Sequence, residues 1–222
     1  MSIYLDSADL KEIKKYINYP FISGVTTNPA LLAKALDKSN ITIYEFEEHI
    51  KKIGDIVEGD IFVQTNRSKA EQIVKESRKI YEILGDKCVV KILPTFEGLK
   101  AMYDLSFKDI RTAATAVFTG VQGYTAILSG ADYVVPYYSR LMRTTQDGFN
   151  IIEDILDIIE VNKFDNQLLV ASLKTTSDVL EVIRAGANAI TIPASLIDEL
   201  YENPQTNEAV KLFKKSLRVS KD

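Results

Sequence analysis

The chain alternates short apolar segments with longer amphipathic segments along its whole length, and this alternation limits the folds open to it. Each short segment has the length of a buried strand, and the segments between them carry apolar residues at helical spacing, as in Ser68–Leu84. Strict alternation of strand and helix produces parallel strands joined by right-handed crossovers. The predicted strands are Ile3–Asp6, Ile22–Thr27, Ile61–Thr65, Val89–Leu93, Thr115–Phe118, Tyr133–Tyr138, Leu168–Ser172 and Ala189–Pro193.

These strand–helix units favour an α/β fold of the (β/α)8 (TIM) barrel type, with residues 1–222 as a single domain. No linker rich in Pro, Gly or Ser divides the chain. An open doubly wound sheet is the alternative, but no G-x-G-x-x-G turn follows the first predicted strand. A further basic amphipathic helix is predicted over about residues 206–220, beyond the helices that a barrel needs. Its apolar side chains require a cover, so we expect a homo-oligomer in which this helix packs on a neighbouring subunit; they are Val210, Leu212, Phe213 and Leu217.

Composition and charge argue against several classes of function. A formal net charge of -4 gives no electrostatic case for nucleic acid or an anionic membrane as a partner. The sequence has no run of roughly 20 apolar residues and no secretory signal at its start, and Cys88 is its only cysteine, so a cytoplasmic protein without disulfides is expected. The single histidine, His49, lies in a polar helical stretch. Histidine-rich metal sites and Ser-His-Asp arrangements are therefore not expected.

Lys91 is the residue that most clearly indicates chemistry. It follows the apolar run Cys88–Val90 and precedes Ile92 and Leu93, so it lies within a buried-strand pattern. A buried charge is costly unless it is paired, neutralised or used. Burial lowers the pKa of a lysine, and an unprotonated amine can form a Schiff base with a carbonyl substrate. The sequence alone leaves open a lysine that reaches solvent from the end of its strand.

Polar residues also lie at the ends of other predicted strands. In a barrel these ends meet at one mouth, so we expect the side chains to gather there. Each has a structural alternative, such as a helix cap for the aspartate, packing for the tyrosine and solvent for the arginine, whose guanidinium also suits phosphate. The residues of this predicted site are Asp6, Asn28, Gln64, Lys91, Thr115, Tyr137 and Ser172, with Arg140 just beyond the sixth strand.

Three segments of the chain resemble the transaldolase family, and most closely its small bacterial branch, which includes fructose-6-phosphate aldolase. They are Gly24-Val25-Thr26-Thr27-Asn28-Pro29-Ala30-Leu31, Val89-Val90-Lys91-Ile92-Leu93-Pro94-Thr95-Phe96-Glu97-Gly98 and Ala171-Ser172-Leu173-Lys174-Thr175. Ala131-Asp132-Tyr133-Val134-Val135-Pro136-Tyr137 with Arg140 also fits that branch. The resemblance extends from Asp6 to the C-terminal helix. It implies a (β/α)8 barrel that acts without cofactor or metal.

The resemblance also implies a role for each residue of the predicted site. Lys91 would form the Schiff base with a ketose such as fructose 6-phosphate, and Asp6 would transfer protons during carbon–carbon cleavage. The dihydroxyacetone hydroxyls would be bound by Thr26 and Asn28. Arg140 and Ser172 would hold the sugar phosphate, helped by backbone N–H groups that open the helix after Lys174. Gln64, Thr115 and Tyr137 would position the water that takes part in forming and hydrolysing the imine.

Two of these residues bear on the choice between related activities. Most transaldolases of the family carry a glutamate and a phenylalanine where this chain has Gln64 and Tyr137, which favours a class I aldolase over a transaldolase that transfers the dihydroxyacetone unit between sugar phosphates. A non-catalytic barrel that serves as a binding module is a third alternative, but no residue of the site is lost. Val135 stands where the branch usually has a small residue, which leaves the natural ketose open. The resemblance further implies rings, as pentamers or decamers.

Overall fold

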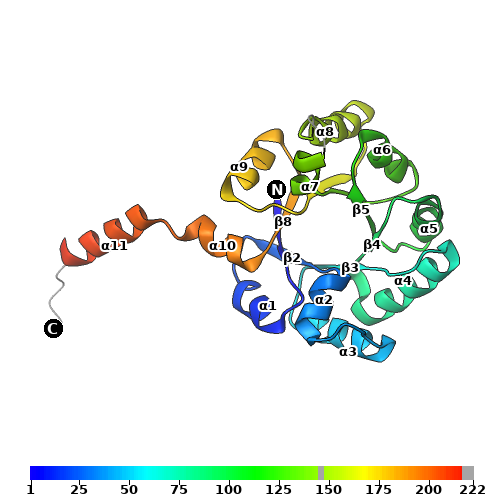
Figure 1. Cartoon of the computed structure of the whole chain (residues 1–222), viewed down its shortest axis with the longest axis horizontal. Helices are drawn as coiled ribbons and strands as arrows, with labels where there is room; N and C mark the ends of the chain where they lie inside the picture. Colours follow the sequence, from blue (N-terminus) through cyan, green and yellow to red (C-terminus); the bar gives the residue numbers. More distant parts are fainter. Residues whose placement is uncertain (145–147, 217–222) are drawn as a thin grey trace.

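The strands of this computed structural model, which describes residues 1–144 and 148–216, close into a parallel barrel in sequence order (Figure 1). Each strand pairs with the next, and the last closes on the first, where Thr191 lies opposite Tyr4. The predicted (β/α)8 fold is therefore confirmed, and the open-sheet alternative is wrong. The strands are β1 (Ser2–Asp6), β2 (Ile22–Thr26), β3 (Asp60–Gln64), β4 (Cys88–Ile92), β5 (Thr112–Val117), β6 (Tyr133–Pro136), β7 (Gln167–Val170) and β8 (Ala189–Ile192).

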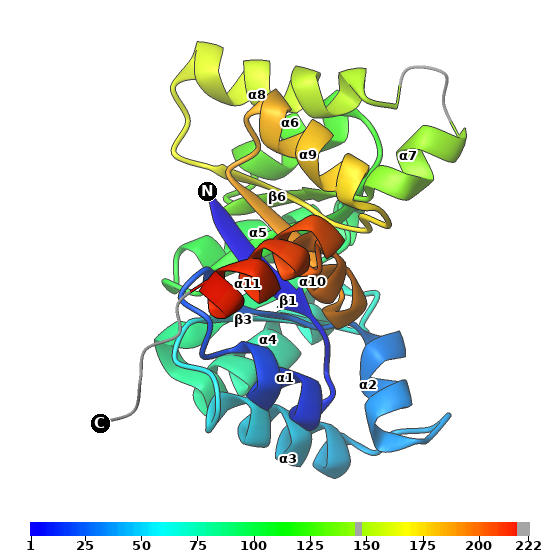
Figure 2. The same cartoon turned by 90° about the vertical axis from the view of Figure 1, so that its left-hand side faces the viewer.

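Helices surround the barrel, and their apolar faces cover the outward side chains of the strands (Figures 1 and 2). Most begin where the sequence supplies a capping side chain, as Asp9, Asn28 and Thr175 do. The helices are α1 (Leu10–Tyr16), α2 (Pro29–Leu36), α3 (Ile43–Gly54), α4 (Ala70–Leu84), α5 (Phe96–Ser106), α6 (Gly120–Leu128), α7 (Tyr138–Thr144), α8 (Asn150–Asn162), α9 (Thr176–Ala185), α10 (Ala194–Tyr201) and α11 (Pro204–Ser216), and a short 3-10 helix spans Gly85–Lys87.

Three strand boundaries differ from those predicted by two residues or more, and the others agree to within one residue. Strand β5 begins at Thr112, three residues before the predicted start, because Ala113 and Ala114 are weak strand formers that the barrel nevertheless pairs with Lys91 and Ile92. The predicted sixth and seventh strands are too long at their ends. Tyr137 and Ser172 lie just beyond β6 and β7, and the positive φ of Ser172, 67°, is incompatible with a continued strand.

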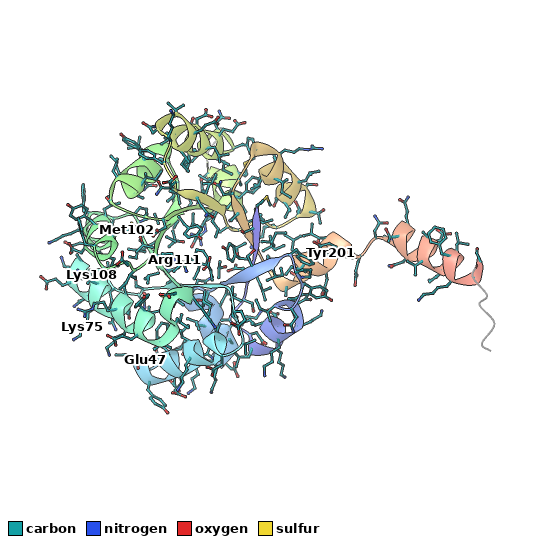
Figure 3. The ribbon with its side chains drawn as sticks, turned by 180° about the vertical axis from the view of Figure 1, so that it is seen from behind. Glu47, Lys75, Met102, Lys108, Arg111 and Tyr201 are labelled. Atoms are coloured by element: carbon teal, nitrogen blue, oxygen red, sulfur yellow. The ribbon has the colours of Figure 1, made fainter. Side chains whose placement is uncertain are left out.

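Inside the barrel, alternate residues of the strands pack into an apolar layer, as the two-residue period of a strand requires. At the N-terminal end this layer is closed by a polar cluster: the hydroxyls of Tyr4 and Tyr133 donate to Asp60 Oδ2 at 3.1 and 3.4 Å, and Arg111 donates to Asp60 Oδ1 at 2.8 Å. Figure 3, drawn from behind, labels Arg111 inside the ring of helices. The layer consists of Tyr4, Phe62, Val89, Ala113, Tyr133, Val135, Leu169, Ala171 and Ala189.

Helix α11 leaves the body of the molecule instead of covering the barrel (Figures 1 and 2). None of its residues is buried, and Val210 and Phe213 are 43% and 69% exposed. The helix begins at Pro204, two residues before the predicted start, and Leu217 lies outside the described residues. Across the ranges 1–144 and 148–216, no helix has the length and apolarity needed to cross a membrane.

Candidate active site

A ring of polar side chains lies above the apolar layer of the barrel, two residues further along the strands. Lys91 follows Val89, Asp6 follows Tyr4 and Thr115 follows Ala113 at this spacing, so the same period that builds the core also turns these side chains inward. The strands' C-terminal ends hold the active site in barrel enzymes. By this spacing the ring contains Asp6, Thr26, Gln64, Lys91, Thr115 and Thr191, with Tyr137 two residues after Val135.

Lys91 is buried, with 4% of its surface exposed, and its Nζ donates to the carbonyl oxygen of Thr27 at 2.8 Å. The alternative of a lysine reaching solvent is therefore wrong. Burial lowers the pKa of Lys91 because desolvation disfavours the charged form, and the nearby charge of Asp6 opposes this effect. An amine in this environment has the properties that a Schiff-base nucleophile requires.

Asp6 lies beside the same strand end. Thr26 Oγ1 donates to Asp6 Oδ1 at 2.8 Å, while Asp9, not Asp6, caps α1 by accepting from Lys11 N and Glu12 N. The helix-cap alternative for Asp6 is therefore wrong, and its carboxylate lies within electrostatic range of Lys91. The end of β2 thus brings a carboxylate and an amine together, because Thr26 holds one and Thr27 holds the other.

Asn28 is the N-cap of α2, as the sequence Asn28-Pro29 indicates. Its Oδ1 accepts from Leu31 N at 3.0 Å and caps α2. This cap uses the amide oxygen and leaves the amide nitrogen as a donor beside the mouth. A role of Asn28 in binding hydroxyl groups stays a prediction.

Gln64 and Thr115 lie on the two strands that pair with β4, and Tyr137 follows β6, one strand further round the barrel. Gln64 lies directly opposite Lys91 in the pairing of β3 with β4. On the other side, Thr115 is fully buried and its Oγ1 lies 3.2 Å from the hydroxyl of Tyr137. The strand has a bulge between Thr115 and Val117, where Ala116 adopts a positive φ of 62°. Backbone strain of this kind often marks a functional site.

Arg140 lies on the first turn of α7, next to Tyr137. Its guanidinium carbon is 5.1 Å from the centroid of the Tyr137 ring, within the range of a cation–π contact. Arg140 also lines a hollow of about 390 Å³ together with Phe118, Arg143 and Thr144. Two of the residues that line the hollow are arginines, whose side chains suit an anion.

Ser172 faces α7 from the turn after β7. Its Oγ lies 2.7 Å from the Oγ of Ser139, so the two hydroxyls form a hydrogen-bonded pair. Ser139 directly precedes Arg140 in α7. The capping box of α9 takes up two backbone N–H groups in this region. Lys174 N and Thr175 N donate to the carboxylate of Asp178 at 2.8 and 3.1 Å, because Asp178 completes the capping box of α9. These two N–H groups are therefore taken, and the prediction that backbone N–H groups opening α9 help to bind an anion stays a prediction for the residues from Thr176 on.

Sequence reasoning missed two members of this region. Thr191, on β8, lies within 2.6 Å of Thr26 Oγ1, and Ser139 pairs with Ser172. The two-residue period from Ala189 was the signal for Thr191, because it places that side chain inside the barrel. Ser139 is a serine on the first turn of α7, and no sequence pattern separates it from a surface residue.

His49 lies away from this site, and a second hollow meets the site only at Gln64. The helix of His49 is polar on average, but the side chain itself is buried, and its Nε2 lies 2.8 Å from the carbonyl oxygen of Ala8. The larger hollow, about 680 Å³, lies outside the barrel along α3 and α4, near Glu47 and Lys75 in Figure 3, and reaches Gln64 at one end. Within the described part of the chain, no three His, Cys, Asp or Glu side chains form a group that could hold a metal ion.

Comparison with known proteins gives a consistent result over the whole chain. The sequence profile of the family described as Transaldolase/Fructose-6-phosphate aldolase matches residues 3–222. A probable transaldolase of Thermoplasma volcanium is 41% identical over 213 residues, which cover 96% of this chain and 93% of that protein. Proteins of the same description from Clostridioides difficile and Aquifex aeolicus are each 36% identical over 215 residues, covering 97% of this chain and 96% and 95% of theirs.

Proposed function

Because the chain belongs to the transaldolase/fructose-6-phosphate aldolase family, we propose that it cleaves and forms fructose 6-phosphate, or a related ketose, as a class I aldolase. The family makes it an enzyme of the aldolase or transferase type, for which a sugar phosphate is a fitting substrate. The observation that carries the finer proposal is Lys91, a buried lysine with a lowered pKa and a carboxylate within electrostatic range.

The reaction begins with the amine of Lys91. Nζ adds to the C2 carbonyl of the ketose, and loss of water from the carbinolamine leaves a protonated imine, which is an electron sink for the next step. The lowered pKa supports this step because it raises the fraction of unprotonated amine. In this proposal, Gln64, which lies opposite Lys91, and the Thr115–Tyr137 pair hold the water that leaves and returns.

Cleavage needs a base near the imine. Asp6 takes the proton of the C4 hydroxyl, the C3–C4 bond breaks, and its electron pair moves toward the imine to give an enamine and an aldehyde. Protonation of the enamine at C3 and hydrolysis of the imine release dihydroxyacetone and restore Lys91. Thr26 supports this assignment, because its hydroxyl holds one oxygen of Asp6 and leaves the other for the substrate.

A transaldolase differs only in the fate of the enamine, which waits for an acceptor aldose phosphate. The relatives described as probable transaldolases favour this second function, whereas Gln64 and Tyr137 favour the aldolase. Purified protein with fructose 6-phosphate is expected to release free dihydroxyacetone without any acceptor, measured by a coupled reductase assay. Reaction only after erythrose 4-phosphate is added would assign the transaldolase, and no reaction with or without the acceptor would contradict the proposal for this ketose.

Arg140 is the proposed anchor of the substrate phosphate. We expect Arg140→Ala to lower kcat/KM for fructose 6-phosphate by at least about tenfold, since loss of a charge-assisted contact costs roughly 2–5 kcal/mol when it is desolvated and 1.4 kcal/mol is a factor of ten. The exposed position of Arg140 places the effect at the lower end of that range. Cleavage of fructose without phosphate, measured in parallel, is expected to fall much less.

Arg143→Ala is the matched comparison, because it removes the same charge from the same helix and the same hollow. Arg143 Nε donates to the carbonyl of Ser139, so part of its guanidinium is already occupied, and we expect a smaller loss. Equal losses for the two variants would mean that the charge of α7 as a whole, and not Arg140, attracts the phosphate. Equal losses on fructose and its phosphate would assign Arg140 to the fold or to the chemistry.

We further propose that α11 packs on a neighbouring subunit of a homo-oligomer, either a ring of five subunits or a decamer of two such rings stacked. The support is a helix whose apolar side chains lie away from its own barrel. Val210→Ser with Phe213→Ser is expected to lower the mass measured by light scattering, while Lys211→Ser with Lys215→Ser on the charged side leaves it unchanged. A monomeric wild-type protein at micromolar concentration would contradict the proposal.

A further inference from the structure

Thr191 lies inside the barrel at the level of the proposed catalytic residues. Strand β8 alternates Ala189 and Thr191, which face inward, with Ile190 and Ile192, which pack among the outer core residues. Thr191 is 2% exposed. A buried hydroxyl is costly unless it is hydrogen-bonded, so its partner is informative.

That partner connects Thr191 to Asp6 through one intermediate. Thr191 Oγ1 lies 2.6 Å from Thr26 Oγ1, and Thr26 Oγ1 lies 2.8 Å from Asp6 Oδ1. The three residues belong to adjacent strands, because β1 pairs with both β8 and β2. The side chains therefore form a chain of two hydrogen bonds across the inner face of β1.

The direction of this chain follows from the number of hydrogens. A hydroxyl has one hydrogen to donate, and an ionised carboxylate only accepts. When Thr26 donates its hydrogen to Asp6, the short contact with Thr191 is a hydrogen bond only if Thr191 is the donor. Thr191 thereby fixes the rotation of the Thr26 hydroxyl toward Asp6.

We infer that Thr191 is a positioning residue for the proton transfer by Asp6, an inference that rests on the function proposed above. By orienting the Thr26 hydroxyl, Thr191 keeps Asp6 Oδ1 engaged and turns Oδ2 toward the reacting hydroxyl of the substrate. Thr191 itself touches no substrate atom in this scheme. Its contribution is to the geometry of the base, so it acts on kcat and only through Asp6.

Thr191→Val tests this inference, because valine keeps the shape and removes only the hydroxyl. We expect kcat for dihydroxyacetone release from fructose 6-phosphate to fall about tenfold, as for loss of a hydrogen bond in a charged network, with KM within about twofold of the wild type. Thr191→Ser keeps the hydroxyl and loses a methyl group, so it is expected to retain most of the activity. A packing role predicts the reverse order, with serine worse than valine.

The double variant separates an action through Asp6 from a general effect. In the Asp6→Asn background, Thr191→Val is expected to cause no further loss of kcat, because its target has already been removed. An equal loss in both backgrounds, or full activity of Thr191→Val, would overturn the inference. Failure of the proposed function is distinguishable, since the wild-type enzyme would then release no dihydroxyacetone and form no borohydride-stable adduct on Lys91.

Discussion

Replacing Lys91 by methionine is expected to lower dihydroxyacetone release from fructose 6-phosphate by more than about 10⁴-fold, because losing a covalent nucleophile removes the whole imine pathway. Methionine fills a similar buried volume, so the fold is expected to persist. In the wild-type enzyme, borohydride added with dihydroxyacetone reduces the C=N bond of the imine to a stable amine. Peptide mass mapping is expected to find the three-carbon adduct on Lys91.

Lys174→Met is the matched control for Lys91→Met. Lys174 lies in the turn after β7 and is exposed, so it serves as a lysine near the mouth without the burial that lowers the pKa of Lys91. The control is expected to keep the adduct on Lys91. An adduct on Lys174, or turnover by Lys91→Met close to the wild-type rate, would reject the Schiff-base assignment.

Asp6→Asn is expected to lower kcat by roughly 10²–10⁴-fold, the usual contribution of a positioned general base. Asparagine still accepts the hydrogen bond of Thr26 but takes up no proton, so imine formation is expected to remain detectable by borohydride while cleavage fails. Kinetics of cleavage and the yield of adduct, measured on the same preparation, therefore separate the two steps.

Asp9→Asn provides the control for Asp6→Asn. It makes the same substitution three residues along the chain, and asparagine caps a helix about as well as aspartate, so activity and stability are expected to change little. Loss of the adduct in Asp6→Asn would assign Asp6 to imine formation instead of cleavage. Activity equal to that of the wild type would remove Asp6 from the mechanism.

The barrel was predictable because each strand is a separate local signal, and Lys91 was predictable because a charge inside an apolar run is conspicuous. The boundaries of β5 and β7 were not, because they depend on neighbours that the local sequence does not contain. Ala113 is a strand residue because β4 and β6 lie on either side of it. Just after β7, Ser172 adopts a left-handed backbone conformation, which prevents the strand from continuing. This conformation is typical of glycine, and the sequence has a serine there.

The site residues divide in the same way, into those that the local sequence indicates and those that depend on neighbouring strands. Asp6 and Gln64 were found because they lie at or next to the ends of predicted strands, and the inward direction of such a residue follows from the period of the strand. Thr115 began the predicted fifth strand, and it lies near the C-terminal end of β5 because that strand starts earlier, at Thr112. Thr191 was missed although the period applied to it equally, because the predicted eighth strand continued to Pro193 and left Thr191 in its middle instead of at its end. Which hydroxyl meets which is a property of the closed barrel, since Thr191 and Thr26 are brought together only when β8 joins β1.

The burial of Lys91 also makes the free energy of unfolding depend on pH. Its pKa is lowered in the folded protein, so between that value and the ordinary value of 10.5 the unfolded chain binds more protons than the folded one. Stability therefore rises with pH through that window, and the full penalty is present below it, because the free energy of unfolding follows the difference in bound protons. The residue proposed to perform the chemistry thus weakens the barrel at every pH below that window, and the surrounding core must offset that cost.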